Sequence, residues 1–367
     1  MAEFIRGTGS KLTPIQHSFE IFREYILSYY FNTMTGKRGS GKPIIIDDSL
    51  FKGKGAGDVG RYHFIPQYAV NDPIIGQNAS ITGNEKTLTE FHMDLRVDQI
   101  AQAFAKKGKM TDIRTIWNFR EEAKHQLSEW FRWITELWMV EALSGYITDG
   151  VEHITGTEAN SFAPVNGAGR CIRPDYASGT FSSVQVSPED TSTDALLSDM
   201  TTTDTMNTHI LDILQDFAKT AGKYPMKPIR AQNGEEYYML VLHPKSAIDL
   251  RNDERWEKRA LAAMTGKGSL DNDPIATGAI GVWEHIIIKE ANFVKTHKGS
   301  DVTIARNLLL GADAAVLAYA QTLDYNEELR DHKRIMSISA DEIRGMRKMV
   351  FDECDLNVAQ LPCAISA

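Results

Sequence analysis

The stretch from Thr111 to Tyr146 reads TDIRTIWNFREEAKHQLSEWFRWITELWMVEALSGY, and its first glycine is Gly145. It contains no proline, so nothing interrupts a helix before that glycine. At a rise of about 1.5 Å per residue, these roughly 36 residues would form a rod about 50 Å long. Ordinary globular helices have only about three turns. We therefore expect one unusually long helix that organises the fold.

Apolar residues recur every three or four positions along this stretch, which is the period of one helix face. The apolar stripe consists of Phe119, Ala123, Leu127, Trp130, Phe131, Ile134, Leu137 and Trp138. A helix with one apolar side needs a partner surface, as a core helix of a large domain or as the spine of a more specialised fold. Four side chains are predicted to make the packing contacts of this helix: Leu127, Trp130, Ile134 and Trp138.

The chain has 367 residues, enough for two or three domains or for one elaborate domain. Its three cysteines, Cys171, Cys354 and Cys363, form no CxxC pair, so we expect reduced and buried thiols. The N-terminal residues lack the apolar segment of a secretory signal, and nowhere do about 18 apolar residues run together. These features predict a protein that is made in the cytoplasm and has no membrane partner.

Charge is distributed unevenly along the chain. The net charge is −9, but the residues through Tyr62 carry a net of +3, which leaves −12 for the rest. An acidic body with a mildly basic arm is not typical of a dedicated nucleic-acid binder. The acidic, Thr-rich segment 187–208 contains no Lys or Arg and lacks the EF-hand pattern. We interpret it as a solvated polar insertion.

Outside the long helix, helical and extended patterns mix without a regular βαβ rhythm, and no repeat of fixed period occurs. Residues 15–34 predict an amphipathic helix, and residues 44–96 are mostly extended and interrupted by turns. Later segments predict, in order, a strand (YYMLVLHP), a helix (KSAIDLRNDERWEKRALAAM), a strand (GVWEHIIIKE), a strand turning into a helix (ARNLLLGADAAVLAYAQ) and a closing strand pair (RIMSISADEIRGMRKMVFD). The fold class predicted is α+β.

Two glycine motifs match phosphate-binding loops in letters but not in context. GKRGSGK, from Gly36 to Lys42, matches GxxxxGK, but Pro43 stands where such a loop needs a metal-binding Ser or Thr. The flanking segments also run helix, loop, strand instead of strand, loop, helix. GAGDVG, from Gly55 to Gly60, matches GxGxxG, but a proline-containing extended segment follows where a helix should begin. We expect neither motif to bind a nucleotide.

No residue pattern predicts catalysis, a cofactor or a metal. The ten histidines include no HExxH motif, and no His or Cys pair has zinc-ligand spacing. His243 lies between a predicted strand and Pro244, and we expect it to cap a helix or to be buried. No nucleophile elbow or kinase motif set occurs. A long chain whose sequence contains no catalytic, cofactor or metal motif predicts a structural protein and not an enzyme.

The order of the segments resembles that of the major capsid proteins of tailed bacteriophages, in the branch of the N-four-like phages. The resemblance covers about residues 58–352. It is carried by GDVGRYHFIP, the run from Val97 to Gly145, YYMLVLHPKSAIDLRNDERW, IGVWEHIIIKE, RNLLLGADAAVLAYAQ and IRGMRKMVF. None of these is a catalytic signature, so the order and spacing of the segments carry the likeness.

The resemblance implies the Hong Kong 97 type capsid fold, which has an N-terminal arm, an extended loop, a peripheral domain with a long spine helix, and an axial domain. The arm and the loop are expected to bury little within their own subunit and to lie across neighbours. The implied division is an arm (1–50), an extended loop region (51–109), the spine helix and start of the peripheral domain (110–154), an axial domain with the polar acidic insertion (155–277), peripheral strands (278–301), an axial strand and helix (302–322), and peripheral closing strands with the C-terminus (323–367).

The implied function is that of a major capsid protein that self-assembles into an icosahedral phage head enclosing double-stranded DNA. The implied partners are many copies of itself in pentamers and hexamers, DNA bound without sequence preference, and scaffolding, portal and decoration proteins. The protein would be made in the host cytoplasm and would reside in the virion. Five basic residues are suspected to face the DNA or to make arm contacts, unless they only solubilise the arm: Lys37, Arg38, Lys42, Lys52 and Lys54.

Two other functions stay open at the level of the sequence. A cellular, encapsulin-like nanocompartment shell would share the architecture but would assemble empty or around a protein cargo. An unrecognised soluble enzyme would need a pocket with convergent polar groups and a strongly perturbed ionisable residue.

Overall fold

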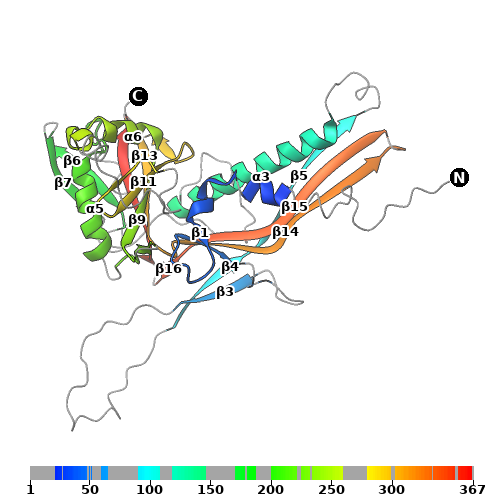
Figure 1. The fold of residues 1–367 in the computed structure, drawn as a ribbon, viewed down its shortest axis with the longest axis horizontal. Coiled ribbons are helices and arrows are strands. Elements are labelled where there is room, and N and C mark those ends of the chain that lie inside the picture. Colours follow the sequence, from blue (N-terminus) through cyan, green and yellow to red (C-terminus); the bar gives the residue numbers. More distant parts are fainter. Residues whose placement is uncertain are drawn as a thin grey trace, which may run out of the picture.

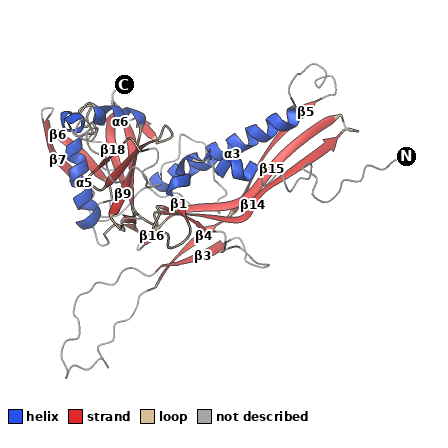
Figure 2. Cartoon of the chain, in the orientation of Figure 1, coloured by secondary structure: helices blue, strands red, loops and turns tan. Residues whose placement is uncertain are grey.

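The computed structural model describes residues 21–26, 28–47, 49, 51, 59–64, 90–107, 118–145, 170–177, 180–186, 200–220, 225–231, 234–258, 279–298, 302–332, 334–351 and 354–365. Two sheets organise this part of the chain, one of five strands and one of seven, and a long helix runs from one to the other (Figure 1). Helices and strands are mixed throughout, as Figure 2 shows, so the α+β prediction is confirmed.

The predicted long helix is α3 (Phe119–Ser144). The side chain of Asn118 caps its start by accepting a hydrogen bond from the N–H of Arg120 at 3.2 Å. Gly145 ends the helix with φ of 66°, in the left-handed region that favours glycine, and its N–H donates to the carbonyl of Glu141 at 2.8 Å. The helix therefore ends where the sequence predicts. The predicted residues before Asn118 lie outside the described chain.

The five-stranded sheet packs against α3 and has the strand order β1-β2-β14-β15-β5. Its strands are β1 (Thr35–Gly36), β2 (Ile44–Asp47), β5 (Asp98–Lys107), β14 (Ala315–Arg330) and β15 (Ile335–Lys348). β14 and β15 form a long antiparallel hairpin that projects from the rest of the molecule beside α3 (Figure 1). Along the hairpin, Leu323 and Tyr325 are buried and cluster with α3, while Asp324 and Asn326 are exposed.

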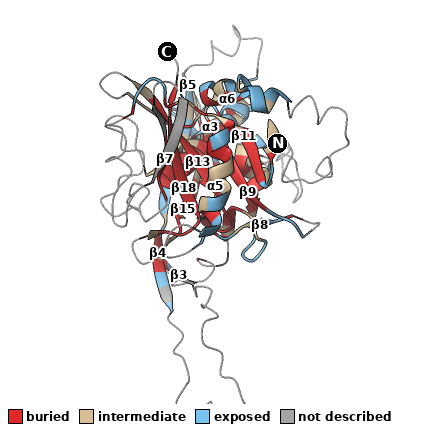
Figure 3. Cartoon of the chain, turned by 90° about the vertical axis from the view of Figure 1, so that its left-hand side faces the viewer, coloured by how far each residue is buried: buried red, intermediate tan, exposed pale blue. Residues whose placement is uncertain are grey.

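The seven-stranded sheet has the order β10-β11-β9-β13-β12, with β18 also paired to β13 and β8 to β9. Its strands are β8 (Ile229–Arg230), β9 (Glu236–Leu242), β10 (Gly281–Trp283), β11 (Ile286–Glu290), β12 (Thr296–Lys298), β13 (Thr303–Leu310) and β18 (Val358–Ile365). Leu240 of β9 clusters with α5 (Thr208–Thr220) and α6 (Pro244–Arg251), whereas Met239 and Val241 cluster with α3. Both faces are therefore covered, and the strands are buried (Figure 3).

The remaining described elements are short. They include the 3-10 helix η1 (Tyr30–Met34) and three two-stranded pairs: β3 (Val59–Phe64) with β4 (Phe91–Arg96), β6 (Ile172–Ala177) with β7 (Thr180–Val186), and β16 (Val350–Phe351) with β17 (Cys354–Asp355). The β3–β4 pair packs at its root on the five-stranded sheet, through a cluster that includes Tyr62, Leu95 and Val316. Residues 44–47, 59–64 and 91–96 are strands, as the sequence predicts for this region.

The prediction of a strand and a helix over 302–322 is wrong, because this segment forms β13 and the start of β14. Alanine favours helices, and the first four residues of β14, from Ala315 to Ala318, resemble part of a helix in composition. They are buried instead on both faces of a sheet: Ala315 and Leu317 join one apolar cluster, and Val316 and Ala318 join another. Pairing with β2 on one side and β15 on the other overrides the local preference.

The pairing of strands differs in three places from the order read along the sequence. The strands β10, β11 and β12, within the segment 278–301, belong to the seven-stranded sheet, in which β11 pairs with β9, and not to the sheet of β14 and β15. β18, within the segment 323–367, also joins that sheet through β13. The segment GVWEHIIIKE is not one strand but an antiparallel pair that turns at Glu284, where φ is 51°. Strand partners across the chain cannot be deduced from local apolar runs.

Gly345 lies on β15 where β4 crosses it, and a Cβ at this position would overlap the carbonyl oxygen of Arg96. We predict that Gly345→Ala lowers the free energy of unfolding by about 2–3 kcal/mol, because β4 must move to make room. Urea unfolding measures the change. Gly39→Ala is the matched control, since nothing lies near its Cβ position but its φ is 84°, so it should cost only about 1 kcal/mol of strain. Equal losses in both variants would contradict the overlap.

Candidate functional site: an arm packed against the long helix

The N-terminal arm packs against its own subunit. Residues 21–34, with residue 27 outside the described chain, form what we call the strap: a helical segment followed by η1. Five large strap side chains are at most 6% exposed: Ile21, Tyr25, Tyr29, Phe31 and Met34. They join two apolar clusters with α3 and the sheets. The expectation that the arm buries little within its own subunit is therefore wrong for the strap.

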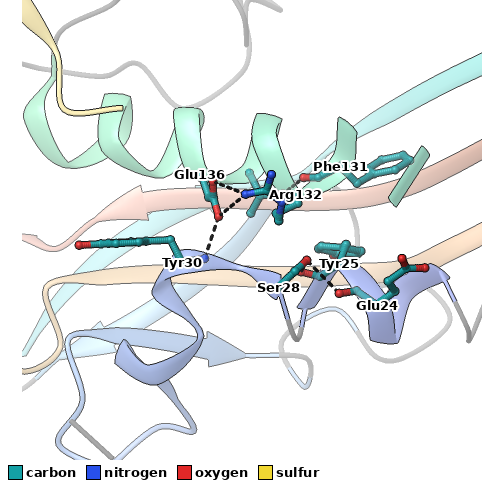
Figure 4. Close-up of polar contacts among 8 residues, drawn as sticks. Glu24, Tyr25, Ser28, Tyr30, Phe131, Arg132 and Glu136 are labelled. Atoms are coloured by element: carbon teal, nitrogen blue, oxygen red, sulfur yellow. Dashed lines mark hydrogen bonds and ion pairs between the residues drawn. The ribbon is translucent and has the colours of Figure 1, made fainter. Parts of the chain in front are cut away.

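Polar contacts fix the strap on α3, as Figure 4 shows. The backbone N–H of Tyr30 donates to Oε1 of Glu136 at 2.7 Å, and Arg132 pairs with the same carboxylate at 3.3 Å. Burial raises the pKa of Glu136, although the hydrogen bond from Tyr30 and the charge of Arg132 oppose the rise. Farther toward the start of α3, His125 Nδ1 lies 3.2 Å from Oε1 of Glu24.

Aromatic contacts tie the strap to the seven-stranded sheet as well. The ring of Phe293, which follows β11, lies 4.9 Å from the ring of Tyr30 in an edge-to-face arrangement and 5.7 Å from that of Phe31. The strap therefore contacts both α3 and the segment that follows β11. Its position couples the unit built on the five-stranded sheet to the unit built on the seven-stranded sheet.

A fully buried ion pair lies beneath the strap, between Glu342 and Arg344 of β15, with 2.8 Å from Oε1 to Nη1. The hydroxyl of Tyr25 donates to Oε2 of Glu342 at 3.1 Å, and it lies 3.0 Å from the hydroxyl of Tyr319. Since the Tyr25 proton is committed to Glu342, Tyr319 is the donor of that second bond. Nη1 of Arg344 donates to Oγ1 of Thr135 in α3. We call these five side chains the buried ionic centre.

Burial and pairing act in opposite directions on the two charges of this centre. Burial raises the pKa of Glu342, and Arg344 opposes the rise. Burial alone would lower the pKa of Arg344, but Glu342 and the surrounding tyrosines reverse the shift and leave it raised. The guanidinium also lies 5.5 Å from the ring centroid of Trp138. A charge pair in such a medium is stable only while its hydrogen-bond partners stay in place.

The four residues predicted to pack α3 lie on its inward side. Leu127, Ile134 and Trp138 are buried, and Trp130 is half-buried with its ring edge-to-face against Phe131 at 5.0 Å. Trp133, one turn before Leu137, is 51% exposed at the edge of this side. The apolar stripe of the sequence therefore coincides with the side of α3 that faces the strap and the sheets.

The suspected basic residues behave differently from one another. Residues 36–42, between β1 and β2, form what we call the basic loop. Lys37 is exposed, whereas Arg38 donates to the carbonyl of His63 at 2.9 Å and covers the ring of Tyr62 at 4.6 Å. Lys42 donates to the carbonyl of Thr33 at 3.1 Å. Lys52 and Lys54 lie outside the described residues.

Lys289 of β11 was missed by the sequence analysis. It is buried, and its Nζ donates to Oγ1 of Thr33 in the strap at 2.8 Å. Burial, followed by the charge of Lys42, lowers the pKa of Lys289 to about 8. The available signal was a lysine that directly follows three isoleucines in the apolar strand IIIKE.

The lowered pKa of Lys289 predicts a dependence of stability on pH. A lysine whose pKa is lower in the folded than in the unfolded chain destabilises the fold below about pH 8, and the penalty fades as pH rises toward the unfolded value near 10.5. We predict that Lys289→Met raises stability at pH 7 by about 1–2 kcal/mol, after allowance for solvent screening. Thermal unfolding in buffers free of phosphate should show this gain shrinking between pH 8 and pH 10. A gain that is the same at both pH values would contradict the assignment.

The other residues singled out by the sequence have structural positions. His243 caps α6, its Nδ1 accepting from the N–H of Lys245 at 3.2 Å, so the predicted capping role is confirmed. Burial, then the charge of Lys245, lowers the pKa of His243. All three cysteines are free thiols. Within the described ranges, no cluster of His, Cys, Asp and Glu is arranged to hold a metal, and no helix has the length and apolar character needed to cross a bilayer.

Comparison with protein families gives a match over nearly the whole chain. Residues 18–358 match the family model described as phage capsid protein. A curated relative, the major capsid protein of Pseudomonas phage KPP25, is 27% identical over 309 residues, which is 77% of this chain and 75% of the relative.

Solved structures share the fold. The capsid of Ralstonia phage GP4 matches with a TM-score of 0.75 and 21% identity, over 92% of this chain and 92% of that one. The capsid asymmetric unit of cyanophage Pam1 matches with a TM-score of 0.69 and 19% identity, over 100% of both chains. The acidic stable capsid structure of Helicobacter pylori bacteriophage KHP30 matches with a TM-score of 0.64 and 14% identity, over 91% of this chain and 90% of that one.

Proposed function

Because this chain belongs to the phage capsid protein family and is a bacteriophage major capsid protein, we propose that its copies close into an icosahedral shell around double-stranded DNA. The observation that carries the proposal is the family match over residues 18–358, which covers the strap, α3 and every strand of both sheets except β18. The protein is a structural component of the virion, and many copies of it make up the capsid.

The two sheets support a division of the chain into two domains. We assign the peripheral domain to α3 with the five-stranded sheet, and the axial domain to the seven-stranded sheet with α5 and α6. This moves residues 279–298 and 358–365 into the axial domain. Projecting elements such as the β14–β15 hairpin can contact different surfaces on successive copies, and such head-to-tail contacts close into rings. Pentamers and hexamers of the axial domain are the rings that an icosahedral shell needs.

Contact with DNA would be electrostatic and independent of sequence. Lys37 is the described residue best placed for it, because it is exposed in the basic loop. Arg38 and Lys42 are tethered to His63 and Thr33, so they would contribute mainly as fixed positive charges. Lys52 and Lys54 complete the proposed set. Scaffolding, portal and decoration proteins are the further proposed partners, and the host cytoplasm is the proposed place of synthesis.

The test is the size of the purified protein, measured by light scattering and by negative-stain imaging at several salt concentrations. We expect closed shells tens of nanometres across. Nuclease treatment of shells isolated from infected cells should leave protected double-stranded DNA inside. A compact monomer or dimer under every condition, with and without co-expressed phage proteins, would contradict the proposal. Shells that enclose protein and no DNA would favour a nanocompartment instead.

A further inference from the structure

Two lysines meet at one threonine where the strap crosses the seven-stranded sheet. Lys289 reaches the hydroxyl of Thr33 from β11, at 2.8 Å, and Lys42 reaches the carbonyl of the same residue from the basic loop, at 3.1 Å. Lys289 is 3% exposed and Lys42 is half-buried. The pair therefore has one buried member and one half-buried member.

No carboxylate within the described residues balances these two charges. Lys289 makes no ion pair there, and the only charge that perturbs it appreciably is the like charge of Lys42. Glu290, the next residue of β11, pairs with Arg251 at 2.9 Å. A buried ammonium is costly unless a negative partner accompanies it. The arrangement therefore calls for an anion from outside the described chain.

The polar groups that surround the two lysines have hydrogen bonds left to donate. Each ammonium has three N–H groups, of which one is used on Thr33. The Thr33 hydroxyl accepts from Lys289 and keeps its own proton to give. Several donors and two positive charges suit a ligand with several acceptor oxygens.

We propose that Lys42, Lys289 and Thr33 bind a tetrahedral oxyanion of the phosphate class. Two ammonium groups neutralise a dianion, and lysine is a common point-charge partner of phosphate. Thr33 belongs to the strap and Lys289 to the seven-stranded sheet, so the bound oxyanion clamps the strap onto that sheet. The site rests on these side chains and not on shell formation, and it exists in the isolated subunit.

The test compares the melting temperature of the subunit in sodium phosphate and in sodium chloride of equal ionic strength at pH 7. We expect a saturable rise with phosphate in the parent chain and at least tenfold weaker binding in both Lys42→Met and Lys289→Met. Lys289→Arg keeps the charge and should keep most of the response. Lys219→Met removes an exposed charge from α5, on the other face of the sheet, and should change nothing. An equal response to phosphate in the parent chain and in Lys289→Met would overturn the site.

A second experiment identifies the source of the oxyanion. A short DNA duplex is titrated against the parent chain and against Lys289→Met at fixed salt. If backbone phosphate is the ligand, Lys289→Met weakens duplex binding and inorganic phosphate competes with the duplex in the parent chain. If free phosphate is the ligand, the duplex binds both chains alike while inorganic phosphate still distinguishes them. A failure of both probes to distinguish the chains would refute the site and leave the shell proposal untouched.

Discussion

Glu342→Leu should lower the free energy of unfolding by about 3–5 kcal/mol, because it leaves the guanidinium of Arg344 buried in the ionic centre without its counter-ion. The same change leaves the Tyr25 hydroxyl without its acceptor, which loosens the strap where it crosses β15. Urea unfolding of the subunit, followed by tryptophan fluorescence, gives the free energy. Hydrogen exchange over residues 21–34 should report faster opening of the strap.

The double variant Glu342→Leu/Arg344→Leu is the matched control. Replacing a whole buried ion pair by apolar residues is often neutral or stabilising, whereas removal of one partner is not. We therefore expect the double variant to recover most of the stability lost by the single one. A double variant as unstable as the single variant would show that side-chain volume, and not the stranded charge, dominates at this position.

Trp138→Ala should cost about 3–5 kcal/mol, since it empties a large buried volume where α3, the strap and both sheets meet. It also removes the ring that lies against Arg344. Trp133→Ala is the natural control, because it deletes the same side chain on the same helix at a position that is 51% exposed. In the isolated subunit it should change stability by no more than about 0.5 kcal/mol.

The same pair of variants separates folding from assembly. If Trp133→Ala leaves the subunit stable but prevents shells from closing, its ring belongs to a contact between copies. A Trp138→Ala variant that is no more destabilising than Trp133→Ala would contradict the burial of Trp138 in the core.

The long helix could be predicted because its signals are local. Its apolar stripe, its lack of proline and the glycine that ends it all lie within one stretch, and its observed end at Ser144 follows from Gly145. The capping role of His243 is local in the same way. The fold class and family followed from the order of such segments along the chain.

What the sequence could not reveal depends on contacts between distant residues. The start of β14 resembles a helix until β2 and β15 are placed beside it. Strands β10, β11 and β12 share a sheet with β9 only because long-range pairing brings them together. Lys289 is a candidate residue because the strap places Thr33 within hydrogen-bond distance of its ammonium group. The ion pair of Glu342 and Arg344 is part of a buried centre because Tyr25 of the strap packs against it.

The strap is the part of the arm that packs within its own subunit. Its large side chains are already buried in the subunit, so docking the strap on a neighbour would first require it to leave α3 and expose them. We therefore expect the strap to stay on its own subunit during assembly. The exposed elements of the described chain would then make the contacts between copies.

A cryo-EM reconstruction of the assembled protein would show both the form of the assembly and the position of the strap in it. We predict a closed icosahedral shell in which residues 21–34 of every copy pack on their own α3, with Tyr25 on Glu342 and Tyr30 on Glu136 of the same chain. Open sheets or filaments, or a shell in which this segment lies on the α3 of a neighbouring copy, would contradict this prediction.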